Sequence, residues 1–290
     1  MCRLFAFHSI ITSQVHSSLV EADNTLHDLS QKHPDGWGVG YYVEGTPHLI
    51  RSTNCAMEDQ LFLKVSGVVS SNTVLAHIRK ATQGNQTILN SHPFQYGKWI
   101  FAHNGNIKNF QDKREELLKL VDLELKRYIL GTTDSELIFY IIITHIKEYH
   151  SLKDHQIPLE QMKLYINKAL RKITAITGLP THRNDPTPTE NYFSFILTNG
   201  TKMIAVNGGQ DLFYCTYKTA CPERDHCPYY GDNCEAPPAE DGLVNHLILS
   251  SEKLSGVNVW KKIEAGEMVG VDKEMKFFKS RLDLRFEKTT

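Results

Sequence analysis

The chain has 290 residues, of which 41% are hydrophobic and 22% charged, an ordinary composition for a soluble globular protein of one large or two small domains. Its formal net charge of −1 gives no electrostatic reason to expect a nucleic acid or an acidic membrane as partner. No run approaches the roughly 18 apolar residues of a transmembrane helix, and the first residues turn polar too soon for a secretory signal. We therefore expect a cytoplasmic protein.

Short alternating runs of apolar and polar residues predict β-strands in the first hundred residues. The first of these runs is Cys2–Phe7. Gly38–Val43 and His48–Arg51 flank a Glu-Gly-Thr-Pro turn and predict a hairpin. Thr73–Ile78 and Trp99–Ala102 are predicted as further strands.

Three amphipathic helices are predicted for the middle of the chain, because apolar residues recur there at helical spacing. The first is Asn109–Leu130, and the second follows Asp134, a candidate N-cap. The third is Leu159–Ile176. Its apolar stripe is predicted to consist of Leu164, Ala169, Leu170 and Ile173.

The last third of the chain again predicts strands. After a loop at Thr181–Glu190, Asn199-Gly200 separates two apolar runs and is a strong hairpin signal. Six strands are expected in this part: Phe193–Thr198, Thr201–Val206, Leu212–Tyr217, Leu247–Leu249, Met268–Val271 and Lys276–Phe278. Strands, then helices, then strands predict an α+β fold with layered sheets rather than a doubly wound parallel sheet.

Cys2 is the most informative residue for function. Removal of Met1 would leave one residue with both a thiol and a free α-amine. A free amine titrates near 7.7–8.0 and a thiol near 8.5, so the amine can take the thiol proton at neutral pH. A cysteine at position two also occurs by chance, so the segments that follow it decide how it is interpreted.

Two segments in the first eighty residues suit a pocket for an amino-acid amide. His33–Gly40 has three glycines that allow close backbone approach and a tryptophan, Trp37, that could form a wall. A tight turn into a strand is the alternative there. Arg79 ends an apolar strand, where a guanidinium can hold a carboxylate through two hydrogen bonds. A surface arginine in a solvated loop is the alternative.

Three later segments fit the same pocket. His92 could line it, although a loop histidine bonded to backbone carbonyls is the commoner case. Asn104-Gly105 would place a side-chain amide beside a backbone N–H, the two donors that an oxyanion hole requires, although Asn-Gly is usually a turn. Asp134 could receive an α-ammonium group or act only as a helix cap.

In this order, the segments resemble the class II glutamine amidotransferase domain of the N-terminal-nucleophile hydrolases. The matching motifs are the N-terminal Cys, Asp-Gly-Trp-Gly, His-x-Arg-x-Ala-Thr, Asn-x-His-Pro, His-Asn-Gly and Thr-Asp-Ser-Glu. Ser251-Glu252 resembles the family's Ala-Ser-Glu stretch. Gly266-Glu267 resembles its Pro-Gly-Glu strand, with Ala265 in place of the usual Pro.

The resemblance covers residues 2–280, so it implies a single domain there and a C-terminal tail at 281–290. It is greatest for the stand-alone branch, which includes predicted bacterial amidotransferases and the γ-glutamyl amidohydrolase of ergothioneine synthesis. The fold it implies is a four-layer αββα sandwich of two antiparallel sheets.

The resemblance also implies the catalytic roles. Cys2 would be the nucleophile, with its own α-amine as general base. Asn104 and the backbone N–H of Gly105 would bind the oxyanion. The reaction implied is hydrolysis of the γ-amide of glutamine, or of a γ-glutamyl compound, through a γ-glutamyl thioester.

Four further residues would bind the substrate if the resemblance holds. Arg79 would hold its α-carboxylate and Asp134 its α-ammonium group, while Thr82 and His92 would line the site. The family pattern implies no cofactor and no metal at this site. The partner expected is a small-molecule substrate, neither a nucleic acid nor a membrane.

The sequence does not decide which amine leaves in the reaction. Free glutamine would release ammonia, which implies a partner enzyme or a nearby acceptor. A γ-glutamyl peptide or metabolite would need a wider pocket and no ammonia transfer. A third alternative is a non-catalytic subunit that keeps the fold.

Four of the six cysteines lie outside the family pattern, at Cys215, Cys221, Cys227 and Cys234. Their spacing lacks the close pair of usual zinc sites, and a reducing compartment disfavours disulfides. We expect unligated thiols in a variable loop, with a structural metal or disulfides as alternatives.

Overall fold

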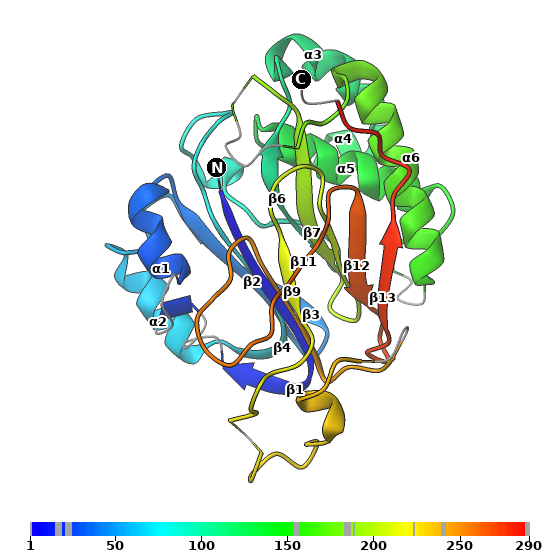
Figure 1. Ribbon diagram of the computed structural model, residues 1–290. Helices are drawn as coiled ribbons and strands as arrows, with labels where there is room; N and C mark the ends of the chain where they lie inside the picture. Colours follow the sequence, from blue (N-terminus) through cyan, green and yellow to red (C-terminus); the bar gives the residue numbers. More distant parts are fainter. Residues whose placement is uncertain are drawn as a thin grey trace.

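The computed structural model describes residues 2–14, 19–20, 25–153, 157–182, 187, 189–222, 224–238 and 242–287. Within these ranges the chain forms two β-sheets whose paired strands all run antiparallel. Figure 1 shows the sheets lying face to face, with the longer helices outside them.

The first sheet has the strand order β11-β9-β10-β1-β4-β2-β3. The longest strand, β1, pairs with β10 on one side and β4 on the other, so the start of the chain lies inside this sheet. The strands are β1 (Arg3–Gln14), β2 (Trp37–Val43), β3 (Thr46–Ser52), β4 (Ser70–Ile78), β9 (Phe213–Cys215), β10 (His246–Ser250) and β11 (Lys261–Lys262).

The second sheet has the order β13-β12-β8-β7-β6-β5. Its central strands are hydrophobic and buried along their length, as expected for a sheet covered on both faces. The strands are β5 (Phe94–Tyr96), β6 (Trp99–Asn106), β7 (Tyr192–Thr198), β8 (Met203–Val206), β12 (Glu267–Val271) and β13 (Phe277–Arg281).

Helices cover the outer face of each sheet (Figure 1). The short α1 (Leu26–Leu29) and α2 (Gln60–Val68) lie on the first sheet. The second sheet is covered by α3 (Phe110–Leu118), α4 (Leu123–Lys126), α5 (Asp134–Lys147) and α6 (Leu159–Thr177). Three 3₁₀ turns complete the described elements: η2 (Ser30–Lys32), η3 (Ile88–Asn90) and η4 (Asp232–Cys234).

The four layers enclose three hydrophobic cores, one between each pair of neighbouring layers. Successive residues of a strand point to opposite faces of its sheet, so one strand can contribute to two of these cores. On β1, Leu4 and Ala6 face the core between the sheets. Phe5 and Phe7 point the other way, into the core below α2. The third core joins the second sheet to α5 and α6. The four-layer αββα sandwich implied by the resemblance is confirmed.

The predicted hairpins are confirmed, with different lengths. Glu44 and Gly45 both have positive φ, 49° and 71°, so β2 and β3 are joined by a two-residue turn rather than a four-residue one. The turn between β7 and β8 contains the predicted Asn199-Gly200.

Two helix predictions were wrong in detail. The span predicted as one helix, Asn109–Leu130, is broken into α3 and α4. Leu164 is 50% exposed and does not belong to the buried stripe of α6. Met162, Tyr165 and Ile166 are buried there instead. Apolar spacing alone does not show which of two overlapping stripes faces the sheet.

Parts of two predicted loops lie outside the described residues, namely 183–186 and 188 in the first and 223 and 239–241 in the cysteine-rich one. The proposed boundary at residue 280 stays a prediction. Among the residues that follow it, Leu282 is buried and Leu284 packs against the core of the second sheet.

Candidate active site

Cys2 directly precedes β1, which begins at Arg3; Figure 1 marks this end of the chain with N. Its Sγ accepts a hydrogen bond from the backbone N–H of Lys80 at 3.3 Å and lies 3.4 Å from the Lys80 carbonyl oxygen. Because Leu4 and Ala6 face the space between the sheets, alternation places the Cys2 side chain on that same face. The thiol therefore lies at the end of the inter-sheet layer.

Arg79 directly follows β4 and is 2% exposed. Its guanidinium donates to the carbonyl oxygens of Gln83 at 2.9 Å, Gly84 at 3.2 Å and Asn85 at 3.2 Å. Burial lowers the pKa of Arg79, whereas the nearby Cys2 thiol and acidic groups raise it. The side chain thus lies close to Cys2 and at the same time holds the loop that follows it.

Asn104 and Gly105 lie within β6, not in a turn. They pair with Ser194 and Phe193 of β7. The Asn104 side chain is buried, and its Oδ1 has no hydrogen-bond partner among the described residues. A buried amide oxygen without a partner can accept a hydrogen bond from a ligand that donates one, whereas an oxyanion would be met by the Nδ2 hydrogens.

Gly105 cannot be replaced without moving the backbone. A Cβ at this position would come within 2.1 Å of both His103 Nε2 and the Tyr192 carbonyl oxygen. Such a distance is a severe overlap. The glycine is therefore required by the close approach of β6 and β7 as well as by any role of its N–H.

Asp134 is the first residue of α5, and the N-cap is Thr133, whose side chain accepts from the Glu136 N–H. The predicted cap was wrong by one residue. Asp134 Oδ2 instead accepts from Ile107 N at 2.7 Å, and Oδ1 accepts from Ser135 N at 2.8 Å. Burial raises the pKa of this carboxyl, and these hydrogen bonds lower it.

Asp134 lies within electrostatic range of Cys2 despite their separation in the chain. Burial raises the pKa of the Cys2 thiol, the Lys80 N–H and Arg79 lower it, and Asp134 raises it. Arg79 and Asp134 therefore both act electrostatically on the thiol, as a pocket for a zwitterionic amino acid would require. The thiol needs a base to be activated, because its raised pKa keeps it protonated at neutral pH.

The buried histidines nearby are poor candidates for that base. Burial lowers the pKa of His33 to about 3 and that of His77 to about 3. Among the described residues, Cys2 Sγ makes hydrogen-bond contacts with the backbone of Lys80, not with an imidazole. The α-amine of a processed Cys2 fits the chemistry better than a Cys–His pair.

The two other predicted binding residues have different surroundings. Thr82 is half-buried in the loop after Arg79. His92 is buried, its ring lies 4.1 Å from that of His77, and neither of its ring nitrogens has a hydrogen-bond partner in the described part. Burial and the neighbouring His77 lower the pKa of His92. Their direct contact with substrate stays a prediction.

In the Asp-Gly-Trp-Gly segment, the expectation for the tryptophan was wrong and the expectation for a glycine was confirmed. Trp37 is buried against Phe62 of α2, on the outer side of the first sheet, so it forms no wall of this site. Gly38 does serve close backbone approach, because a Cβ there would lie 2.1 Å from the His92 carbonyl oxygen. Asp35, which sequence reasoning did not assign, accepts from the Ala81 N–H at 2.8 Å.

The family comparison agrees with this geometry. The model of the class II glutamine amidotransferases matches residues 1–280. The chain belongs to this family.

Relatives share parts of the chain. A Haemophilus influenzae protein named as a glutamine amidotransferase is 31% identical over 211 residues, covering 71% of this chain and 62% of its own length. The probable glutamine amidotransferase DUG3 of Saccharomyces cerevisiae is 31% identical over 160 residues, 49% of this chain and 45% of the relative. The matches thus span about half of these relatives.

A shorter match is to the gamma-glutamyl-hercynylcysteine sulfoxide hydrolase of Mycobacterium tuberculosis, 38% identical over 80 residues, 26% of this chain and 34% of the relative. Among solved structures, a class II glutamine aminotransferase domain protein from Silicibacter pomeroyi has a TM-score of 0.60 at 17% identity. That similarity covers 97% of this chain and 99% of the other, and it shows the fold.

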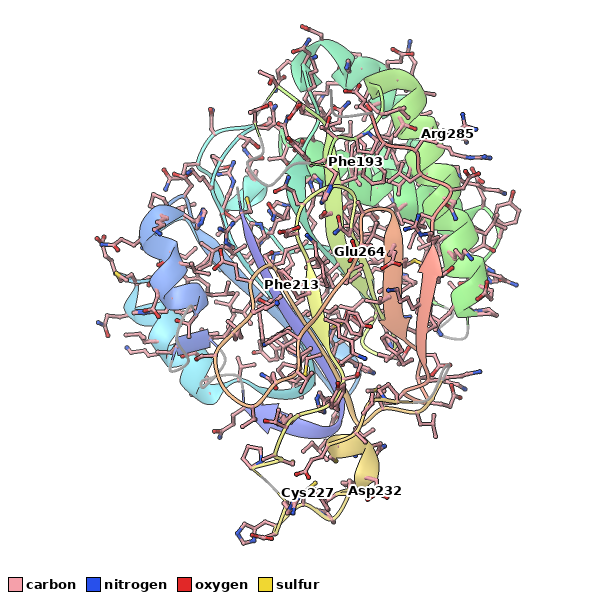
Figure 2. All side chains as sticks on the ribbon, viewed as in Figure 1. Phe193, Phe213, Cys227, Asp232, Glu264 and Arg285 are labelled. Carbon is pink, nitrogen blue, oxygen red and sulfur yellow. The ribbon has the colours of Figure 1, made fainter. Side chains whose placement is uncertain are left out.

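A cavity of about 710 Å³ lies along β1 from Phe5 to Gln14, away from Cys2. Its lining includes Cys221, His226, Cys227 and Cys234. Figure 2 shows Cys227 at the tip opposite Phe193, the partner of Gly105. In the described ranges, no three metal-ligating side chains are close enough to hold an ion, and the six cysteines are free thiols.

Proposed function

We propose that the chain hydrolyses the γ-amide of glutamine, or of a γ-glutamyl compound, with Cys2 as nucleophile. The observation that carries this proposal is that Arg79 and Asp134 both act electrostatically on the Cys2 thiol, whose sulfur accepts a hydrogen bond from the Lys80 N–H next to Arg79. A cation and a carboxylate beside a nucleophile match the α-carboxylate and α-ammonium groups of a glutamyl substrate.

The reaction begins once Met1 has been removed. The α-amine of Cys2 takes the thiol proton, and the sulfur attacks the γ-carbonyl carbon. Asn104 and the Gly105 N–H stabilise the resulting oxyanion. Collapse breaks the C–N bond while the ammonium group of Cys2 returns the proton to the departing amine. Water then cleaves the thioester, which releases the γ-carboxylate and restores the thiol.

To bind the substrate carboxylate, Arg79 would have to replace some of its hydrogen bonds to the protein with hydrogen bonds to the substrate. Its guanidinium donates to three carbonyl oxygens of the loop at 83–85. A carboxylate is a stronger acceptor than a neutral carbonyl. Substrate binding would therefore couple to the position of this loop. Thr82 and His92 complete the proposed lining.

The leaving amine distinguishes two versions of the proposal. Free glutamine yields ammonia, and a partner enzyme would then use it. A larger γ-glutamyl compound yields an organic amine and requires no ammonia acceptor. The name of the mycobacterial relative gives the second version a specific precedent.

The test combines an intact-mass measurement with hydrolysis assays on glutamine and a panel of γ-glutamyl compounds. We expect a mass lacking Met1, glutamate release from at least one substrate, and no release by Cys2→Ala. Full activity in a chain that retains Met1, or in Cys2→Ala, would refute the mechanism. Absence of hydrolysis across the whole panel by the processed chain would favour a non-catalytic subunit.

A further inference from the structure

An ion pair lies directly beside the proposed nucleophile. Arg3 Nε donates to Glu252 Oε1 at 2.6 Å, and a second guanidinium nitrogen lies 2.6 Å from the same oxygen. The remaining nitrogen, Nη1, donates to the backbone carbonyl of Cys2 at 3.2 Å. The guanidinium therefore connects Glu252 to the residue that carries both the thiol and the proposed base.

Glu252 is itself held in place by the end of β10. Ser251 N donates to the Leu4 carbonyl at 3.0 Å, and Leu4 N donates to Ser251 Oγ at 3.0 Å. Glu252 N lies 3.3 Å from Ser250 Oγ. The segment Ser250–Glu252 thus binds β1 at Leu4, the residue after Arg3, and at the Arg3 side chain itself.

A terminal residue needs such support more than an internal one. Once Met1 is absent, Cys2 is attached to the chain only through its carbonyl group. Fixing that carbonyl sets the direction of the Cα atom, and with it the positions of the α-amine and the thiol. Misplacement of a reacting group by about 1 Å can cost two orders of magnitude in rate.

We propose that Arg3 and Glu252 are positioning residues that hold the Cys2 carbonyl, so that the amine and the thiol stay aligned beside Lys80. This inference rests on the proposed function of Cys2 and adds two residues to its machinery. Neither residue touches the reacting atoms in this proposal. Both act through the orientation of Cys2.

The Arg3–Glu252 pair is expected to affect the reaction rate much more than the stability of the fold. The side chains of Arg3 and Glu252 are 24% and 33% exposed, and ion pairs with this exposure stabilise a fold only slightly. Lys147 forms a comparable ion pair with Asp122 on the far layer, 29% and 33% exposed and 2.7 Å apart, and it also contacts the exposed Glu124 at 2.7 Å. Removing either cation should therefore affect folding to a similar, small extent.

The experiment compares Arg3→Met, Glu252→Gln and the control Lys147→Met in the full chain. We expect kcat to fall about 10- to 100-fold in the first two variants, with KM within about 3-fold of wild type. The thermal midpoint should change no more than in Lys147→Met, which should keep its activity. Arg3→Lys, which keeps the charge, should recover part of the lost kcat.

A second measurement does not depend on hydrolysis. Alkylation of Cys2 by iodoacetamide at pH 7, followed by mass spectrometry of the N-terminal peptide, reports how well the amine activates the thiol. We expect a several-fold slower reaction in Arg3→Met and Glu252→Gln. Slower alkylation in a chain that hydrolyses nothing would support the positioning role and reject the proposed function.

Two results would overturn the positioning role while leaving the proposed function intact. One is wild-type kcat and alkylation rate in both Arg3→Met and Glu252→Gln. The other is a loss in kcat matched by an equal loss in Lys147→Met, or fully explained by unfolding, with no recovery in Arg3→Lys.

Discussion

Cysteines lie at the start of β1 and on the strands and loop near its other half, in different environments. At one end, Cys2 is partly exposed, receives a hydrogen bond from Lys80 N and lies near the Arg79 charge. Cys215, on β9, is buried and lies 3.0 Å from the Tyr217 carbonyl oxygen; burial raises its pKa to about 11, and burial also raises the pKa of Cys2. Reactivity depends on exposure, cationic neighbours and a base, so Cys2 is a better candidate for a reactive thiol than Cys215.

The charged side chains around the two sites also differ. The described lining of the cavity at the cysteine-rich end contains one lysine and no carboxylate, whereas the Cys2 end places a buried Asp134 and a buried Arg79 within electrostatic range of the thiol. A zwitterionic substrate matches the second arrangement. Number of cysteines is therefore a weaker guide to function than the charges around each one.

The largest expected difference between the ends is in turnover. Cys2→Ala removes the nucleophile, and we expect hydrolysis to fall by about 10⁴- to 10⁶-fold. Cys234→Ala, at the far end, should stay within about 3-fold of wild type. Steady-state release of glutamate measures both. Comparable losses in the two variants would remove the distinction between the ends.

Asn104→Ala should have the next largest effect. Loss of one oxyanion donor typically costs about 10²–10³ in kcat, while substrate binding is largely kept. Asn233→Ala is a control at the cysteine-rich end, where that amide bonds to Asn245. Initial rates over a range of substrate concentrations separate kcat from KM. Equal losses in binding and turnover for Asn104→Ala would contradict the oxyanion role.

Arg79→Lys should mainly weaken binding. A lysine keeps the charge but cannot donate two parallel hydrogen bonds to a carboxylate. We expect KM to rise about 10-fold with kcat within about 3-fold. Arg171→Lys, in an exposed pair with Asp283, should change neither. A fall in kcat at constant KM would mean that Arg79 does not bind the ground-state substrate.

The smallest effect concerns stability against pH. Burial lowers the pKa of His8 to about 4 and that of His77 to about 3, below the unfolded value of about 6.5. The unfolded chain therefore binds more protons as pH falls, and stability present above about pH 6.5 is lost towards pH 4 and 3.

Between pH 7 and 5.5 each of these histidines should account for about 1 kcal/mol of lost unfolding free energy. Urea unfolding at both pH values measures the change, and His8→Gln should show a shallower dependence. An identical pH dependence in wild type and His8→Gln would show that His8 does not titrate as described.

Much of the fold was predictable because its signals are local. Glu44-Gly45 and Asn199-Gly200 adopt turn conformations through their own backbone preferences, and the strand runs beside them alternate visibly. Helix α2 and the short strands β5 and β11 were missed. Their segments are short or weakly patterned, so tertiary contacts rather than propensity form them.

The candidate site shows the same division. The order of motifs identified the family and pointed to Cys2, Arg79, Asn104 and Asp134. The structure shows that Trp37 faces away from the site and that Glu252 reaches Arg3. These relations depend on strand pairing between distant segments, which composition and spacing do not encode.

The sequence by itself determined the antiparallel hairpins, the amphipathic helices and a cysteine at a position where it can become terminal. Only the tertiary structure decided that Asn104-Gly105 stays extended inside β6, paired with Ser194 and Phe193. The physical reason is that an Asn-Gly pair favours a turn locally, whereas ladder hydrogen bonds and close packing against Tyr192 hold it in the strand.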